Sequence, residues 1–198
     1  MTPASLMDAP DKTTLRARVR EIVRAMTAEE RTDLSRRLCE TARPLLVWQS
    51  ARAVLFFARL PEEPDLTPLI KESWRVGKLT ALPRYDSTSG CYTAALVRGA
   101  AELAPGRFGV PEPCAGCPLC PLNQLDLVFV PGVAFDFTGR RLGRGKGFYD
   151  RLLAEVRGHK CGVAFDAQIV AAVPEEPHDI RVNSILTPTQ WRLCQSAD

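Results

Sequence analysis

Residues 125–151 read LDLVFVPGVAFDFTGRRLGRGKGFYDR, and this stretch decides the fold that we expect. Its first six residues are apolar except for Asp126, and such a run is typical of a strand buried on both faces. A glycine-rich loop follows, and the residues from Phe148 to Val156 then have the pattern of a helix that ends near Gly158. The order of strand, loop and helix places the loop at the carboxyl edge of a parallel sheet, where ligands bind in doubly wound proteins.

The rest of the chain continues this alternation of apolar strands and amphipathic helices. The expected strands are 53–58, 79–82, 92–97 and 161–165, with a last one within 184–194 that Pro188 limits. The expected helices begin at Lys12, at the capping box Thr27–Glu30 (ending near Pro44) and at Asp65 or Thr67 (ending at Gly77). This pattern predicts a single-domain α/β fold, in which helices cover both faces of a mostly parallel sheet in a Rossmann-like three-layer architecture.

Length and composition set the limits of the domain. A chain of 198 residues can bury a core without a metal or a disulfide. We expect residues 1–10 to be a disordered leader and residues 11–198 to form the domain. Within it, residues 104–124 contain five prolines and three cysteines, which predicts one long loop. The net charge is only +3 and no extended run of basic residues lies outside the glycine loop, so we expect no nucleic-acid partner.

The sequence shows no sign of a membrane or secreted protein. No apolar run approaches the roughly 18 residues that a membrane helix needs. The N-terminal residues MTPASLMDAPDK lack the basic and then apolar pattern of a signal peptide. We therefore expect a cytoplasmic monomer, in which seven cysteines are more typical of free thiols or metal ligands than of disulfides.

The glycine-rich loop has the composition of a polyphosphate site. Its glycines alternate with cations, in the set Gly139, Arg140, Arg141, Gly143, Arg144, Gly145, Lys146 and Gly147. Small residues let backbone N–H groups approach phosphate oxygens, while cations neutralise their charge. The spacing excludes a Walker A motif, because GxxxxGK[ST] is absent. Taken alone, GRGKG is equally compatible with a basic surface turn.

The longer block PGVAFDFTGRRLGRGKGFYDRLL resembles the signature of the 5-formyltetrahydrofolate cyclo-ligase family, also called methenyltetrahydrofolate synthetases. Phe148 stands where members usually have a tyrosine. Shorter likenesses follow in family order, namely KTTLR at 12–16, EPD at 63–65, LPRY at 82–85, FGVPEP at 108–113 and HD at 178–179. The resemblance therefore covers nearly the whole chain, from residue 12 to about residue 187.

The resemblance implies ATP-driven closure of 5-formyltetrahydrofolate to 5,10-methenyltetrahydrofolate, with release of ADP and phosphate. A formamide oxygen is a poor leaving group, so it must be activated before N10 can close the ring, and phosphorylation would activate it. Positioning and charge stabilisation supply most of such catalysis. The expected partners are thus 5-formyltetrahydrofolate and ATP, and the expected cofactor is Mg²⁺.

The resemblance also implies roles for individual residues. The expected catalytic residues are Arg144 and Lys146, which would bind the transferred phosphate. The expected ATP contacts are Lys12, Arg16, Arg141, Gly143, Arg144, Gly145, Lys146, Gly147, Phe148 and Tyr149. The expected folate contacts are Leu60, Glu63, Arg144, Phe148 and Tyr149, with the Glu63 carboxylate facing the aminopyrimidine edge of the pterin. Without the resemblance, Lys12 and Arg16 would be read as a solvated helix face and Glu63 as an exposed loop acid.

The expected Mg²⁺ ligands are Asp150 and Asn183. Family members usually have an acid at the second position, in a pattern HD-x-x-x-D, whereas this chain has Asn183. An amide oxygen can still bind Mg²⁺ but carries no charge, so we expect weaker binding or a partial role for Asp179. Asp136 and Asp166 are further acids at strand ends, and either could bind the metal or cap a turn.

Cys114, Cys117 and Cys120 form a C-x₂-C-x₂-C motif that lies outside the family signature. Thiolates at this spacing can bind a structural Zn²⁺, with a fourth ligand from Cys91, Cys161 or His159; the alternative is a loop of free thiols.

Two other functions stay open. The first is a phosphosugar isomerase or acyl-transferase relative on a similar sheet, which would not need Lys12, Arg16 or Glu63. The second is a non-catalytic nucleotide- or RNA-associated module of the same fold. The loss of the acid at Asn183 favours such a module, whereas the complete glycine loop opposes it.

Overall fold

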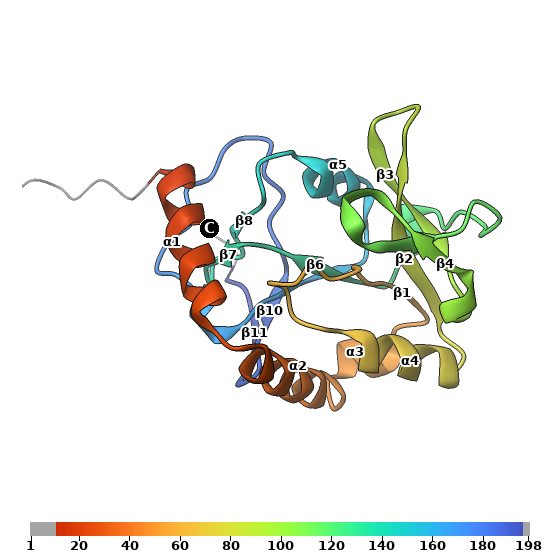
Figure 1. Ribbon diagram of the computed structural model, residues 1–198, viewed down its shortest axis with the longest axis horizontal. Coiled ribbons are helices and arrows are strands. Elements are labelled where there is room, and N and C mark those ends of the chain that lie inside the picture. Colours follow the sequence, from red (N-terminus) through yellow and green to blue (C-terminus); the bar gives the residue numbers. More distant parts are fainter. Residues whose placement is uncertain (1–10, 196–198) are drawn as a thin grey trace, which may run out of the picture.

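A seven-stranded sheet forms the centre of the structure, a computed structural model that describes residues 11–195 (Figure 1). In sheet order the strands are β11 (Trp191–Leu193), β10 (Ser184–Leu186), β9 (His159–Val163), β6 (Leu127–Pro131), β1 (Ala53–Leu55), β2 (Leu79–Asp86) and β3 (Cys91–Leu96). All neighbours from β10 to β2 are parallel, whereas the two edge strands, β3 and β11, pair antiparallel. The predicted mostly parallel sheet is confirmed. The predicted leader, residues 1–10, lies outside the described residues.

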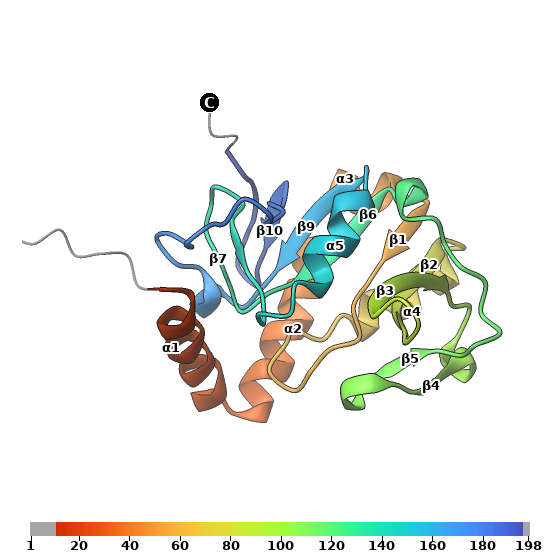
Figure 2. The same cartoon turned by 90° about the horizontal axis from the view of Figure 1, so that it is seen from above.

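Helices cover both faces of this sheet, as predicted (Figures 1 and 2). The helices are α1 (Lys12–Ala25), α2 (Ala28–Ala42), α3 (Leu46–Ser50), α4 (Thr67–Arg75) and α5 (Phe148–Glu155). One face packs against α2, α3 and α4 through a core that includes Leu38, Trp48 and Leu69. The other face packs against α5, which contributes Leu152 and Leu153. None of the helices within residues 11–195 has the length and apolar character needed to cross a lipid bilayer.

Helix α1 packs at the carboxyl edge of the sheet and not on either face (Figure 2). Its buried residues Leu15, Val19 and Val23 form a separate cluster with Leu142 and with Phe165, which follows β9. The helix begins at Asp11, whose carboxylate accepts hydrogen bonds from the first free N–H groups. Helix α2 starts at the predicted capping box of Thr27 and Glu30. This placement brings the first turns of α1 to the edge at which doubly wound folds bind their ligands.

Several segments differ from the sequence-based expectation. The expected loop 104–124 is partly ordered into two short paired strands, β4 (Leu103–Pro105) and β5 (Pro111–Pro113). The last expected strand is two strands, β10 and β11, with Pro188 in their connection. Strand β2 runs past Pro83, because β1 pairs with it only as far as Ala81 and no ladder bond is lost. The remaining short elements are β7 (Ala134–Phe135), β8 (Arg141–Leu142), and the 3₁₀ turns Ala100–Glu102, Arg107–Gly109, Leu122–Gln124 and Asp166–Gln168.

Glu175 ties the segment before β10 to the turn between β7 and β8. Arg181 donates two hydrogen bonds of 2.6 Å to its carboxylate, and Arg140 donates a third of 3.1 Å. These contacts, the Arg181 hydrogen bond first, lower the pKa of Glu175 from 4.5 to about 2. A depressed folded-state pKa stabilises the fold fully above the unfolded value, and this contribution disappears as the pH falls from 4.5 through 2.

We therefore expect the stability advantage of the wild type over Glu175→Gln to shrink as the pH falls across this range. The pair is partly exposed, so the advantage at neutral pH should be at most about 1 kcal/mol. Urea denaturation of both proteins at several pH values between 7 and 2.5 measures it. A difference in unfolding free energy that stays constant over this range would contradict the assignment.

Candidate functional site

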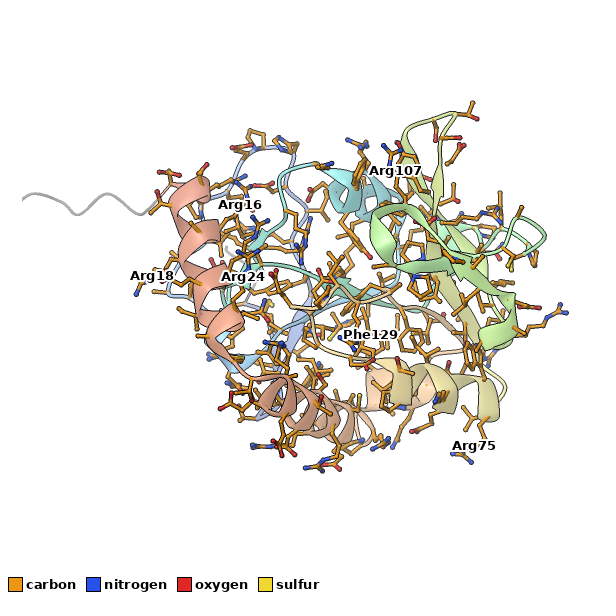
Figure 3. All side chains as sticks on the ribbon, viewed as in Figure 1. Arg16, Arg18, Arg24, Arg75, Arg107 and Phe129 are labelled. Carbon is orange, nitrogen blue, oxygen red and sulfur yellow. The ribbon has the colours of Figure 1, made fainter. Side chains whose placement is uncertain are left out.

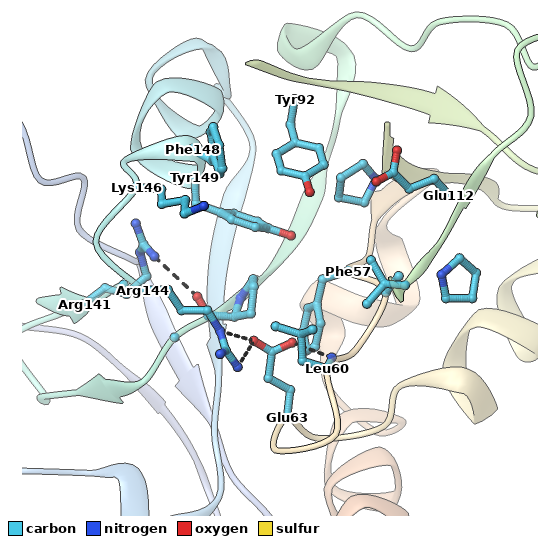
Figure 4. Close-up of a pocket in the computed structure, with 17 residues that line it drawn as sticks. Phe57, Leu60, Glu63, Tyr92, Glu112, Arg141, Arg144, Lys146, Phe148 and Tyr149 are labelled. Atoms are coloured by element: carbon cyan, nitrogen blue, oxygen red, sulfur yellow. Dashed lines mark hydrogen bonds and ion pairs between the residues drawn. The ribbon is translucent and has the colours of Figure 1, made fainter. Parts of the chain in front are cut away.

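Two adjoining compartments lie at the carboxyl edge of the sheet. The first, which we call the apolar compartment, is a cavity of about 350 Å³ lined mainly by Phe57, Leu60, Pro83, Tyr92, Val110, Pro131 and Glu63 (Figure 4). The second, the polar compartment, is lined by Lys12, Arg16, Gly145, Gly147, Asp150, Glu176, His178 and Asp179. Six residues line both: Arg141, Gly143, Arg144, Lys146, Phe148 and Tyr149. The glycine loop is therefore the wall that the two compartments share.

Backbone geometry explains why this wall is rich in glycine. Gly145 and Gly147 have φ values of +94° and +62°, a region that residues with a Cβ rarely adopt. Gly147 is also the residue that precedes α5, so the chain turns directly from the loop into the helix. The free N–H groups of the first turn of α5 and the loop cations are thus placed around one space, which suits an anion.

Glu63 and Arg144 form an ion pair at the boundary of the apolar compartment (Figure 4). Nε and Nη2 of Arg144 lie 3.2 and 3.1 Å from Oε1 of Glu63, and the second carboxylate oxygen accepts the Leu60 N–H at 2.9 Å. The Glu63 side chain is only 9% exposed, whereas that of Arg144 is 38% exposed. Glu63 is therefore a fixed, buried acceptor and Arg144 is a more accessible cation, which corrects the reading of Glu63 as an exposed loop acid.

Arg141 and Asp150 form a second ion pair beneath the loop. Nη2 of Arg141 lies 2.6 Å from Oδ1 of Asp150, and the two side chains are 4% and 16% exposed. The Ile180 N–H also approaches Oδ1, at 3.5 Å. Arg141 was expected to contact ATP, but its side chain is buried and pairs with Asp150 of α5. This ion pair helps to hold the glycine loop against α5. Oδ2 of Asp150 accepts no hydrogen bond from residues 11–195 and remains available to a ligand.

The residues expected from α1 lie on the far side of the polar compartment. Lys12 donates a hydrogen bond of 2.6 Å to Asp179 and lies 3.4 Å from Glu176. Burial alone would raise the pKa of Asp179, but the hydrogen bonds from Lys12 and from the Glu176 N–H lower it. Arg16 donates to the carbonyl oxygen of Gly143 at 2.8 Å, and Figure 3 shows Arg16 directed towards the interior while Arg18 points away. The structure therefore places Lys12 and Arg16 in the same compartment as the glycine loop, and their contact with ATP stays a prediction.

Aromatic side chains line the wall and the mouth of the apolar compartment. Tyr85, Tyr92 and Phe148 pack edge to face, with ring centroids 5.5 to 6.0 Å apart. Burial raises the pKa of Tyr92 to about 12, with a further rise from the charge of Glu112. The Tyr149 hydroxyl points into the cavity (Figure 4), and burial raises its pKa well above 10. Both tyrosines are therefore neutral hydrogen-bond donors at neutral pH.

The structure does not bring Asn183 to this site. Its side-chain oxygen accepts the backbone N–H of Lys160 at 2.8 Å, and the residue precedes β10 at the amino edge of the sheet. The expected pairing of Asn183 with Asp150 around a metal is therefore wrong for this structure. Asp179 lines the polar compartment instead. Asp136 caps the turn before Thr138, and Asp166 accepts a hydrogen bond from Thr189.

The three clustered cysteines do not form a metal site. Among the described residues, no group of three or more histidine, cysteine or acidic side chains could hold a metal ion. The Cys117 thiol instead contacts the carbonyl oxygen of Glu102 at 3.6 Å, and Cys120 lies in the core with a pKa raised by burial. The expected structural Zn²⁺ site at Cys114, Cys117 and Cys120 is therefore not supported, and free thiols remain.

Sequence reasoning missed several residues of the apolar compartment. Phe57 is the second residue beyond the end of β1, and the rule that ligands bind beyond the carboxyl ends of parallel strands could have identified it. Tyr92 carried no such signal, because it enters the site only through its pairing with Tyr85 across the β2–β3 hairpin. Glu112 is buried and accepts the N–H groups of Tyr85 and Arg107, so it fixes the loop that closes this compartment.

A mostly parallel sheet with a cationic loop and an aromatic cavity at its carboxyl edge is typical of α/β enzymes, which bind ligands beyond the carboxyl ends of their strands. Comparison with known proteins narrows this class. The model of the 5-formyltetrahydrofolate cyclo-ligase family matches residues 8–188, and the chain belongs to this family of ligases.

Individual relatives agree with this assignment. The chain is 31% identical to the mouse 5-formyltetrahydrofolate cyclo-ligase, with 87% of this chain and 91% of that protein covered. It is 32% identical to the protein of the same name from Escherichia coli K12, with coverage of 87% and 97%. A solved structure of Aquifex aeolicus 5,10-methenyltetrahydrofolate synthetase superposes with a TM-score of 0.85 at 33% identity, covering 94% of both chains.

Proposed function

We propose that this protein converts 5-formyltetrahydrofolate and ATP into 5,10-methenyltetrahydrofolate, ADP and phosphate, through a phosphorylated formyl oxygen. One observation carries the proposal, namely that a cationic compartment and an aromatic compartment share one wall, built from the glycine loop. Triphosphate and pterin ring would then approach each other across Arg144 and Lys146. Such an arrangement supports the transfer of a phosphoryl group between two ligands.

The apolar compartment has the properties that a reduced pterin requires. It is lined by flat aromatic and proline side chains, and its buried acid, Glu63, matches the donor edge of an aminopyrimidine. Tyr149 and Tyr92 are neutral donors that can hydrogen-bond carbonyl oxygens of the ligand. The volume of about 350 Å³ is at the lower end of small-molecule sites and suits one ring system with its substituent.

The reaction needs the γ-phosphate to be aligned with the formyl oxygen and its growing negative charge to be stabilised. Lys146 and Arg144 line both compartments and supply this positive charge at the point of transfer. After transfer, N10 attacks the formyl carbon, phosphate leaves with the former formyl oxygen, and the proton of N10 passes to the departing phosphate or to water. Because Phe148 and Tyr149 flank the same position, they would limit access of water to the phosphorylated intermediate.

The polar compartment fits Mg²⁺, which usually binds one or two carboxylates together with substrate phosphates. Asp150 offers its Oδ2, and Asp179 lines the same compartment. These two acids would hold the ion, and bound Mg²⁺ would neutralise charge on the phosphates. Asn183 has no part in the proposed site, since its side chain binds Lys160 at the opposite edge.

Turnover can be tested directly by mixing the full chain with MgATP and 5-formyltetrahydrofolate and recording the methenyl chromophore in the near ultraviolet. We expect product that depends on both ATP and Mg²⁺, with one ADP formed for each methenyl product. Omitting the folate provides the matched control for ATP hydrolysis alone. Folded protein that yields no methenyl product under these conditions would exclude the proposed activity.

A further inference from the structure

The ion pair between Glu63 and Arg144 joins the two residues that the proposed function assigns to different substrates. In the proposed function Glu63 faces the pterin and Arg144 faces the phosphates, yet in this structure the two side chains bind each other. If the ion pair uses the same carboxylate oxygens of Glu63 that the pterin needs, it cannot persist when the pterin is bound. The number of hydrogen bonds that the carboxylate can accept decides whether these oxygens are shared.

Counting lone pairs shows that the atoms are shared. An ionised carboxylate offers about four acceptor positions, two on each oxygen. Oε1 of Glu63 accepts both Nε and Nη2 of Arg144, and Oε2 accepts the Leu60 N–H. The donor edge of an aminopyrimidine needs one position on each oxygen. Because both positions on Oε1 are used, a pterin that binds Glu63 through both oxygens must displace at least one of the two Arg144 contacts.

The difference in burial between Glu63 and Arg144 indicates which of the two side chains moves when the pterin binds. The Glu63 side chain is 9% exposed and is anchored to the backbone at Leu60, whereas the Arg144 side chain is 38% exposed and belongs to the glycine loop. A second cation, Arg20, lies close enough that the charge of Arg144 contributes to lowering its pKa, after the larger effect of burial. When a ligand binds Glu63, Arg144 keeps only the 3.9 Å approach of Glu62, which already pairs with Arg24, and it stays near the like charge of Arg20. Arg144 therefore gains by moving into the polar compartment that it already lines.

We propose that the Glu63–Arg144 ion pair couples the binding of the two substrates: the pterin displaces Arg144 from Glu63, and the released guanidinium then binds the phosphates of ATP. The inference rests on the proposed function and adds a direction to it, namely that the folate promotes ATP binding. By linkage, ATP must promote folate binding by the same factor. Arg144 is thus expected to be available to ATP mainly when the pterin is in place.

Isothermal titration calorimetry of the full chain with a non-hydrolysable ATP analogue and Mg²⁺ measures this coupling. We expect saturating 5-formyltetrahydrofolate to lower the Kd of the analogue at least about fivefold, the lower end of typical coupling between sites. The reverse titration, with folate added to protein that is saturated with the analogue, should give the same factor. Equal Kd values for the analogue with and without folate would overturn the proposal.

Glu63→Gln, compared with a control, distinguishes the effect of breaking the ion pair from the effect of removing one negative charge. Its single oxygen can accept only from Leu60 or from Arg144, so the amide nitrogen would face the other donor and break that contact. We expect this variant to bind the analogue more tightly than the wild type without folate, to bind folate more weakly, and to lose the coupling. Glu62→Gln removes the same charge one residue earlier, but Glu62 approaches Arg144 only at 3.9 Å and pairs with Arg24 at 2.6 Å. This control should keep the coupling.

The outcomes distinguish the inference from the function on which it rests. Methenyl product without coupling in the wild type would overturn the inference alone, whereas the absence of product would overturn the proposed function. If Glu62→Gln lost the coupling as fully as Glu63→Gln, a general charge effect would replace the ion pair as its cause. A thermal melt of each variant checks folding, and if Glu63→Gln did not fold, the wild-type titrations would still decide the question.

Discussion

Lys146→Ala is expected to lower kcat/KM for methenyl formation about 10²- to 10³-fold, the usual effect of removing one group that stabilises charge in a transition state. Lys146 is exposed on the glycine loop and lines both compartments, so its charge lies where phosphoryl transfer is proposed. Steady-state kinetics with varied ATP and folate measure the loss. A fall in kcat larger than the rise in KM would indicate that the charge acts mainly in the transition state.

The same substitution should leave the fold intact. Surface substitutions usually change stability by no more than about 0.5 kcal/mol, and the melting temperature of Lys146→Ala should stay close to that of the wild type. Arg18→Ala removes a cation from the outer side of α1, far from both compartments, and serves as the matched control with full activity (Figure 3). Wild-type kinetics for Lys146→Ala would show that the loop is only a basic surface turn, whereas unfolding of the variant would show that Lys146 has a structural role.

Arg141→Met is expected to have the largest effect on stability. It removes a guanidinium that is 4% exposed and leaves Asp150 with a buried charge and no ion-pair partner. Breaking such a pair costs about 3–5 kcal/mol, which corresponds to a fall in Tm of roughly 6–20 °C at this chain length. Because Asp150 faces the polar compartment and water can reach it there, the lower end of this range is expected. Thermal denaturation followed by circular dichroism measures the change.

The neighbouring arginine provides a matched control for this prediction. Arg140→Met also removes a cation from an ion pair, but the Arg140 and Glu175 side chains are 34% and 25% exposed. Such a partly exposed pair contributes about 0–1 kcal/mol, and Arg181 still holds Glu175 in the variant. The double variant Arg141→Met, Asp150→Asn should recover part of the lost stability, since no buried charge is left alone. Equal losses for the two single variants would contradict the buried-pair assignment.

Sequence-based prediction was most accurate for helices and strands that are determined by residues close together in the chain. The apolar run 125–130 became β6, and the capping box at Thr27 opens α2 at the expected residue. The segments that were missed depend on distant contacts. Helix α3 has five residues, too few to show a helical repeat, and the β4–β5 pair is held near β2 by Glu112, which binds the Tyr85 N–H.

The candidate site follows the same rule. The family resemblance named the glycine loop, Lys12, Arg16 and Glu63, and the structure brings all of them to the carboxyl edge. It failed at Asn183. A separation of four residues, from Asp179 to Asn183, can span about 13 Å, and it carries the chain from one edge of the sheet towards the other. The two ion pairs, at Glu63 and at Arg141, could not be read from sequence at all, because their side chains depend on which charges the fold brings together.

The contact between Lys12 and Asp179 joins positions that are 167 residues apart. A chain leaves the ribosome with its N-terminus first, so α1 can form early while its partner acid has not yet been synthesised. The polar compartment is therefore among the last parts of the molecule that translation can complete. A nascent or prematurely terminated chain that lacks the segment around Asp179 would carry the glycine loop but not the wall that faces it. Any activity that needs this compartment should thus appear only when almost the whole domain has been made.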